Sequence, residues 1–150
     1  MEENTKLITE AVSDEVKALI RESIIPDNIR KDVYRRVMEY KQLSIERGRR
    51  PKVFKKDLDR AEFQHHYDEW RLKTYGSSDP IKIMMDSDFQ AIIDMGYRAI
   101  PFIYQIISKR DDFIAFTVPD IVGHLIGEPS YSIPELCKRI KKYIEDTGLV

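Results

Sequence analysis

Residues 89–107 read FQAIIDMGYRAIPFIYQII, and this stretch decides the fold of the chain. Apolar side chains recur at helical spacing on both sides of Gly96. Glycine commonly ends a helix in a left-handed turn, and Pro101 suits the first turn of a following helix because the N–H that it lacks has no partner there. The stretch therefore predicts two short apolar helices joined by a tight corner. Their inward-facing side chains are Phe89, Ile92, Ile93, Ile103, Ile106 and Ile107.

The rest of the chain repeats the helical period, and no segment alternates with the period of two that marks a strand. Asp27 is a suitable N-cap for one helix, which Gly48 then ends. Asp111 or Asp112 suits the start of another, which Pro119 must kink or divide. Further breaks fall at Gly123, Gly127 and Pro129. Helices are expected over residues 6–23, 28–47, 57–75 and 133–146.

Each of these helices has an apolar face. The helix over 28–47 has two apolar arcs, which predicts two neighbours and a central place. The first arc is Ile29, Val33, Val37, Tyr40 and Leu43, and the second is Tyr34, Met38 and Ile45. The inward residues of the other helices are Ile8, Val12, Val16, Leu19, Ile20, Phe63, Tyr67, Trp70, Thr74, Leu136, Ile140 and Ile144.

The length of 150 residues indicates one domain. Charged residues make up 34% of the chain, and Glu, Lys, Arg, Ile and Leu suit an all-helical protein. We therefore predict an all-α, single-domain irregular bundle of about six or seven helices. It comprises an N-terminal helical pair (1–47), a basic connector (48–56) and a helical remainder (57–150) that contains the corner.

The corner resembles the turn between the two helices of a HEAT-type repeat. The resemblance rests on Gly96, Ala99, Ile100 and Pro101, with an apolar stripe on either side. In such repeats the glycine permits the turn, and the alanine-apolar-proline run opens the second helix. The resemblance implies a HEAT-like helical pair in the C-terminal half.

A longer pattern over residues 63–129 resembles a family of small uncharacterised bacterial helical proteins. In that family a tryptophan-rich helix usually precedes the Gly-Glu-x-Pro end, whereas here Phe113 and Phe116 take its place and Pro119 follows. The resemblance implies a fold and no activity. The matching residues are Phe63, Trp70, Thr74, Ser77, Phe89, Ile92, Ile93, Met95, Gly96, Ala99, Ile100, Pro101 and the run Leu125-Ile126-Gly127-Glu128-Pro129.

Charge is unevenly distributed along the chain. The net charge is −1, but residues 30–56 hold eleven Lys or Arg against three acids, a local charge of +8 that leaves −9 for the remainder. Within this region the stretch 47–56, RGRRPKVFKK, has six cations in ten residues. Gly48 and Pro51 predict that it is a connector and not a helix. Its candidate partner-binding residues are Arg47, Arg49, Arg50, Lys52, Lys55 and Lys56.

Three interpretations of this basic segment are open. It binds an acidic protein partner, or it binds nucleic acid with Tyr40 or Phe54 stacking on bases, or it pairs internally and aids solubility. The mixed charges of the helix over 28–47, where Asp32 and Glu39 accompany Arg35, weaken the nucleic-acid interpretation. The acidic protein partner is the prediction that we carry forward.

Other groups offer weaker candidates for chemistry. His65 and His66 are adjacent, so on a helix they point about 100° apart and do not readily share an ion. Pairs of Glu62 with His66, or of His65 with Glu69, have helical spacing, but a solvated helix face is the prediction. There is no phosphate-binding glycine loop, GxSxG or HExxH motif.

The paired aspartates, Asp86 with Asp88 and Asp111 with Asp112, precede apolar helical runs and are expected to cap helices. Cys137 has basic neighbours that favour a thiolate, but its expected role is a small core residue. We therefore predict that the protein is not an enzyme and that it has no catalytic, cofactor or metal site.

Location follows from what the sequence lacks. A lone cysteine suggests a reducing compartment, the first residues have no basic start leading into an apolar run, and no apolar run reaches 18 residues. We expect a cytoplasmic protein with no membrane partner. The predicted function is a non-enzymatic protein-interaction module, an accessory component of a larger bacterial system. The alternative is a small nucleic-acid-binding regulator that uses the basic segment.

Overall fold

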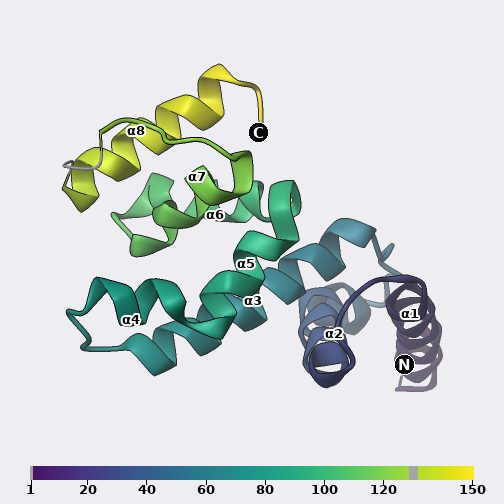
Figure 1. Ribbon diagram of the computed structural model, residues 1–150. Helices are drawn as coiled ribbons and strands as arrows, with labels where there is room; N and C mark the ends of the chain where they lie inside the picture. Colours follow the sequence, from purple (N-terminus) through teal and green to yellow (C-terminus); the bar gives the residue numbers. More distant parts are fainter. Residues whose placement is uncertain (1, 129–131) are drawn as a thin grey trace. The chain divides into compact units, whose positions relative to one another are not determined.

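A computed structural model describes residues 2–128 and 132–150, and Pro129 lies outside the described residues. The described residues form eight α-helices and three short 3-10 helices, with no strand among them, which confirms the all-α prediction (Figure 1). Six of the α-helices have nine or more residues. The α-helices are α1 (Glu2–Glu22), α2 (Arg30–Glu46), α3 (Lys55–Thr74), α4 (Pro80–Met85), α5 (Ser87–Met95), α6 (Ile100–Lys109), α7 (Thr117–Val122) and α8 (Ile133–Asp146), and the 3-10 helices are η1 (Asp27–Ile29), η2 (Gly96–Ala99) and η3 (Phe113–Phe116).

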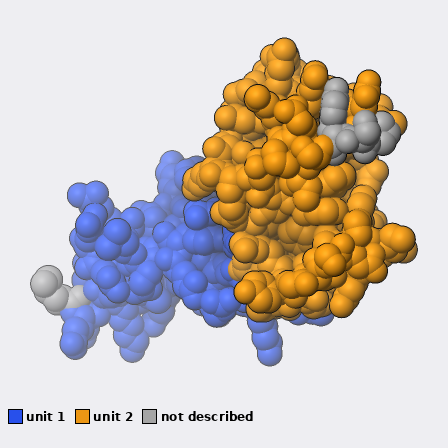
Figure 2. Space-filling view, turned by 90° about the vertical axis from the view of Figure 1, so that its left-hand side faces the viewer, with its two compact units in different colours: residues 1–65 blue, residues 66–150 orange. Residues whose placement is uncertain are grey.

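The chain groups into two compact units, residues 1–65 (unit 1) and 66–150 (unit 2), coloured separately in Figure 2. The division falls within helix α3. The prediction of a single domain stays a prediction, and each unit is described below by itself.

Unit 1 is built on the packing of α1 against α2 (Figure 1). The two helices bury aliphatic stripes against each other, as their sequence periods predict. Ile8 and Leu19 pack at the margin of this core, half-buried. The buried residues of the core are Val12, Val16, Ile20, Ile25, Ile29, Val33, Val37, Ile45, Leu58 and Ala61.

One predicted core residue of α2 is wrong. Leu43 is 59% exposed, whereas Ile45 is fully buried. The buried residues Val33, Val37 and Ile45 follow a row with a spacing of four, which is inclined to the helix axis. Because this row is inclined to the helix axis, it reaches Ile45 at the end of the helix and leaves Leu43 outside the core.

Asp27 is also not the N-cap that the sequence predicts. It lies inside η1, where its carboxylate pairs with Arg30 at 3.0 Å, and no side chain caps η1 or α2. Helix α1 ends at Glu22, before Pro26 as expected. The short helix α4, which has no buried residue, is absent from the sequence prediction.

In unit 2 the corner of residues 89–107 forms as predicted. Helix α5 leads through η2 into α6, with Pro101 in the opening turn of α6. Gly96 has φ +63° and ψ −140°, so its φ is positive but its ψ is not that of the left-handed helical region. Residues other than glycine almost never adopt this conformation. The likeness to a HEAT repeat stays a prediction.

The rest of the unit 2 core follows from the predicted stripes. Trp70 is buried, its indole N–H donates to the Ile83 carbonyl at 3.0 Å, and its ring packs against Phe89 with centroids 5.5 Å apart. Leu136, Ile140 and Ile144 of α8 are buried. The helix expected around Pro119 is divided into η3 and α7, with Pro119 in the first turn of α7.

The corner generates a test of backbone conformation. We expect Gly96→Ala and Gly96→Val each to lower the free energy of unfolding by about 1–3 kcal/mol, because both residues must adopt a conformation that costs this much. A Cβ at Gly96 would meet no atom within 4 Å, so the cost lies in the backbone and not in a clash. Denaturant unfolding followed by circular dichroism measures it.

Tyr97→Val is the matched control, because Tyr97 is exposed in the same corner and its φ is not positive. Its effect should stay within about 0.5 kcal/mol. Equal unfolding midpoints for Gly96→Val and Tyr97→Val would show that the corner does not constrain Gly96.

Trp70 is the only tryptophan, so its fluorescence reports on unit 2 directly. With 3% of its surface exposed, it should emit at shorter wavelength than the unfolded chain and resist quenching by iodide. Trp70→Ala should cost about 3–5 kcal/mol, whereas Leu72→Ala, at an exposed position of the same helix, should cost little. Emission typical of an indole in water would contradict the packing described here.

Candidate functional site

The structure places the basic segment, residues 47–56, between two helices of unit 1. Helix α2 ends at Glu46 and α3 begins at Lys55, so most of the segment is a non-helical connector as predicted. Lys55 and Lys56 fall within the predicted connector but lie in the first turn of α3, which begins two residues earlier than the predicted start at residue 57. All six candidate side chains are exposed: Arg47, Arg49, Arg50, Lys52, Lys55 and Lys56.

The backbone of the basic segment is anchored at both ends. Gly48 has φ +74°, and the pair of bonds from Arg49 N–H to Ser44 O and from Gly48 N–H to Ile45 O, each 2.9 Å, closes α2 as a Schellman motif. At the other end the Phe54 N–H donates to the Asp57 carboxylate at 2.8 Å. The cations are therefore presented by a chain with defined ends.

Asp57 also binds a cation from α2. Its Oδ2 lies 2.8 Å from Lys41 Nζ, and the two side chains are only 18% and 13% exposed. Lys41 Nζ further lies 5.7 Å from the centre of the Phe54 ring. This mostly buried pair ties the start of α3 to α2.

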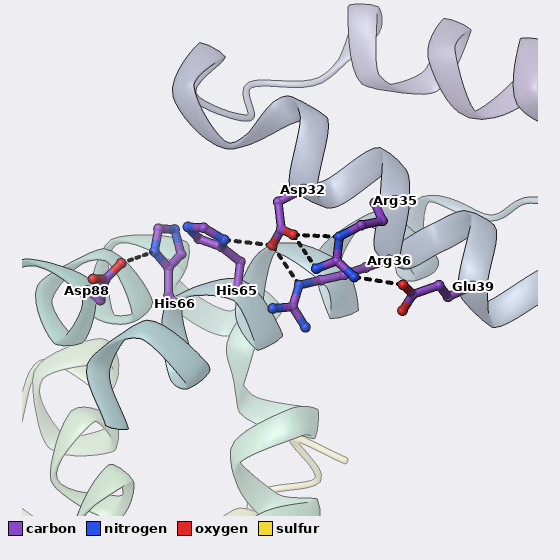
Figure 3. Close-up of polar contacts among 7 residues, drawn as sticks. All are labelled: Asp32, Arg35, Arg36, Glu39, His65, His66 and Asp88. Atoms are coloured by element: carbon purple, nitrogen blue, oxygen red, sulfur yellow. Dashed lines mark hydrogen bonds and ion pairs between the residues drawn. The ribbon is translucent and has the colours of Figure 1, made fainter. Parts of the chain in front are cut away.

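Cations within α2 are neutralised by acids at helical spacing (Figure 3). Asp32 binds Arg35 and Arg36, and Glu39 binds Arg35 at 2.7 Å. In the basic segment only Arg50 binds an acid, Glu15, at 2.8 Å. Across residues 2–128 and 132–150, no acid pairs with the following side chains: Arg47, Arg49, Lys52, Lys55 and Lys56.

The Asp32 carboxylate gathers a further partner, because its Oδ2 lies 2.7 Å from His65 Nδ1 (Figure 3). Burial raises the pKa of this carboxyl group. Hydrogen bonds from Arg36, His65 and Arg35 outweigh burial and hold the pKa well below its usual range. Asp32 is therefore ionised at neutral pH.

The prediction of a solvated face for His66 is wrong. His66 is buried in unit 2, with its Nδ1 2.8 Å from Asp88 Oδ1 (Figure 3), and Glu62 is buried as well. Lys73 binds the other oxygen of Asp88 at 2.6 Å. Burial raises the pKa of Asp88, but His66 and Lys73 outweigh it and lower the pKa. His66 is a buried structural residue of unit 2, held by a carboxylate.

The remaining candidates have structural roles that the sequence predicted. Asp86 caps α5 by accepting from the N–H groups of Asp88 and Phe89, and Asp112 caps η3. Cys137 is buried, and burial raises the pKa of its thiol, which opposes the thiolate that its basic neighbours suggested.

Of the two candidate stacking aromatics, only Phe54 is accessible. It is 57% exposed in the middle of the basic segment. Tyr40 is half-buried, and the guanidinium of Arg60 lies 4.1 Å from the centre of its ring.

A second group of cations escaped the sequence analysis. Lys17 and Arg21 of α1 and Arg30 and Lys31 of α2 line one groove in unit 1. In the sequence these cations are visible only as basic residues on either side of the turn between two amphipathic helices. They form one group only when the two helices pair.

Comparisons with protein-family models, curated proteins and solved structures find no match to this chain. The resemblance to small bacterial helical proteins stays a prediction. Among the helices of the described residues, none combines the length and apolar character that crossing a bilayer requires. The geometry of the basic segment is that of a cationic surface.

The Asp32 network generates a test with a pH readout. Asp32→Asn should lower the free energy of unfolding at pH 7 by about 1–3 kcal/mol, because three cationic or polar donors lose an ionised acceptor. The folded pKa lies below the unfolded value of about 3.9, so this stabilisation is complete above that value and is lost as pH falls through the folded pKa. The wild type should therefore lose more stability than the variant on acidification below about pH 4.

Glu39→Gln is the control, since Glu39 binds Arg35 but is 61% exposed. It should cost at most about 0.5 kcal/mol. Equal effects of the two substitutions at pH 7, measured by denaturant unfolding, would show that the Asp32 network does not stabilise unit 1.

Proposed function

We propose that this protein is a non-enzymatic interaction module that binds an acidic partner protein through the basic segment, as an accessory component of a larger bacterial system. The observation that carries the proposal is the set of five exposed cations that no acid of the described chain neutralises. They adjoin helix α2, in which Arg35 and Arg36 find acids three or four residues away.

Internal pairing accounts for only one cation of the basic segment. Arg50 binds Glu15, and both side chains are substantially exposed, so this pair contributes little to stability. The other cations of the segment repel one another without compensation from described residues. An acidic surface of a partner supplies the missing charge and brings the two proteins together faster.

Two of the cations also oppose the helix that carries them. Lys55 and Lys56 lie in the first turn of α3, where the helix dipole is positive and a cation costs a few tenths of a kcal/mol. Helix stability therefore does not account for the position of these two lysines. Carboxylates of a bound partner would stabilise both cations there.

The exposed ring of Phe54 adds an apolar anchor to the charges. Aromatic residues and arginine are the types that dominate binding energy in protein interfaces. The anchored backbone around Phe54 presents the ring at little cost in conformational entropy. We expect a partner with an apolar recess bordered by Asp and Glu.

Nucleic acid is the second candidate, because an exposed aromatic ring among cations is also how proteins bind single strands without sequence preference. Phe54 would stack on a base while the cations contact phosphates. In that case the logarithm of affinity for a single-stranded oligonucleotide falls linearly with the logarithm of salt concentration. Each phosphate contact removed reduces that slope by about 0.7.

The test replaces four unpaired cations of the basic segment with Gln: Arg47, Arg49, Lys52 and Lys56. Partners are first identified by co-purification with the wild-type chain and then purified for binding kinetics. We expect the variant to associate at least about 10-fold more slowly with an acidic partner, and the difference to fade at high salt. Unchanged circular dichroism would confirm that the fold is retained.

A variant of equal charge change serves as the control, with four exposed lysines of unit 2 replaced by Gln: Lys82, Lys109, Lys138 and Lys142. It should bind the partner like the wild type. Equal losses in the two variants, or full affinity of the first, would refute the proposal. Salt-sensitive binding of the oligonucleotide with no acidic protein partner would support the second candidate.

A further inference from the structure

A groove of about 360 Å³ runs along unit 1 where the end of α1 meets the start of α2. Its floor consists of Ile20, a residue of the aliphatic core, and Tyr34. The Tyr34 hydroxyl is held by Ser13 Oγ at 2.7 Å, so the ring is fixed in place. Four cations form the walls: Lys17, Arg21, Arg30 and Lys31.

These cations are only weakly compensated within the protein. In the part of the chain that the structure describes, no acid pairs with Lys17, Arg21 or Lys31. Arg30 pairs with Asp27, whose side chain is 96% exposed. The groove therefore carries four positive charges against one carboxylate.

Helix stability explains only part of the arrangement. Arg21 lies in the last turn of α1, where the negative end of the helix dipole favours a cation. Lys17 is four residues from Arg21, however, and like charges at this spacing repel. Arg30 and Lys31 open α2, where the positive end of the helix dipole disfavours cations. A ligand of opposite charge relieves both unfavourable interactions.

The polar groups are also oriented before any ligand arrives. Arg30 Nε donates to the Ile25 carbonyl at 3.1 Å, which fixes the guanidinium and leaves its two terminal amino groups without a hydrogen bond to any described residue. Lys17 Nζ lies 5.7 Å from the centre of the Tyr34 ring. Guanidinium and ammonium groups are the side chains that proteins use to bind phosphate.

We propose that this groove binds a small ligand that carries two or more adjacent phosphate groups, either an inorganic polyphosphate chain or a nucleoside phosphate. The walls belong to two packed helices, whose axes typically lie about 8–10 Å apart. A chain of phosphates offers more negative charge and more acceptor oxygens to the cations of both helices than a single phosphate does. A ligand charge of −3 or −4 also matches in size the net positive charge of the groove.

This site is separate from the basic segment. The groove lies at the start of α2 and the segment follows its end, about 24 Å away for the 16 residues from Lys31 to Arg47 at 1.5 Å per residue. The inference therefore does not rest on the proposed function, and cations of the basic segment serve as its control.

The experiment titrates the full chain with inorganic tripolyphosphate, ATP and inorganic phosphate at physiological ionic strength, by calorimetry and by amide NMR shifts. Tripolyphosphate or ATP should bind at least about 10-fold more tightly than phosphate, since one more pair of charge-assisted hydrogen bonds is worth that much. Tighter binding of ATP than of tripolyphosphate would identify the nucleoside phosphate as the source, and the reverse would identify the inorganic chain.

Two double variants of equal charge and composition make the test specific. R21Q/K31Q removes two groove cations whose side chains make no hydrogen bond or ion pair with described residues, and R49Q/K52Q removes two from the basic segment. We expect a loss of about 10-fold or more in tripolyphosphate affinity for the first and less than about 2-fold for the second.

Melting curves that match the wild type would show that both variants fold. Equal losses in the two variants, shifted amides outside the groove only, or no saturable binding by wild type below about 1 mM would overturn the proposal.

Discussion

The ion pair between Lys41 and Asp57 is the interaction on which the presentation of the basic segment depends. Lys41 falls in the buried row of α2 between Val37 and Ile45, so its side chain is only 13% exposed. A charge in such a place costs several kcal/mol unless it is paired. The carboxylate that pairs with it also accepts the Phe54 N–H and so opens α3. One acid thus compensates a buried charge and fixes the start of α3, where the basic segment ends.

Charge in unit 1 is organised by position along α2. Within the helix Asp32 and Glu39 neutralise Arg35 and Arg36 at a spacing of three or four residues, which requires no long-range structure. At the two ends of the helix other cations lack such acids: Lys31 in the first turn, and Arg47 and Arg49 after the end. The uncompensated charge is therefore concentrated at the two ends of α2, where a bound ligand or partner protein would neutralise it.

Local signals in the sequence predicted most of the fold, because glycine and proline act on the backbone where they stand. Gly48 ends α2, Pro101 opens α6, and the period of residues 133–146 gives α8 its bounds. The errors concern features that depend on neighbouring elements, such as the exposure of Leu43 and the burial of His66. The exposure of the basic segment was predictable from its turn residues. The cationic groove was not, because its walls become neighbours only when α1 and α2 pair.

The two cationic surfaces of unit 1 are proposed to bind separate ligands. Their separation of about 24 Å along α2 is about three times the Debye length of about 8 Å at physiological ionic strength, so a charge bound at one end is screened from the other. Coupling between them would then have to pass through the contact of α1 with α2. That contact is made of buried aliphatic side chains, such as Val12, Val16, Val33 and Val37, and close-packed side chains of this kind do not deform readily. We infer that occupation of the groove leaves the affinity of the basic segment unchanged.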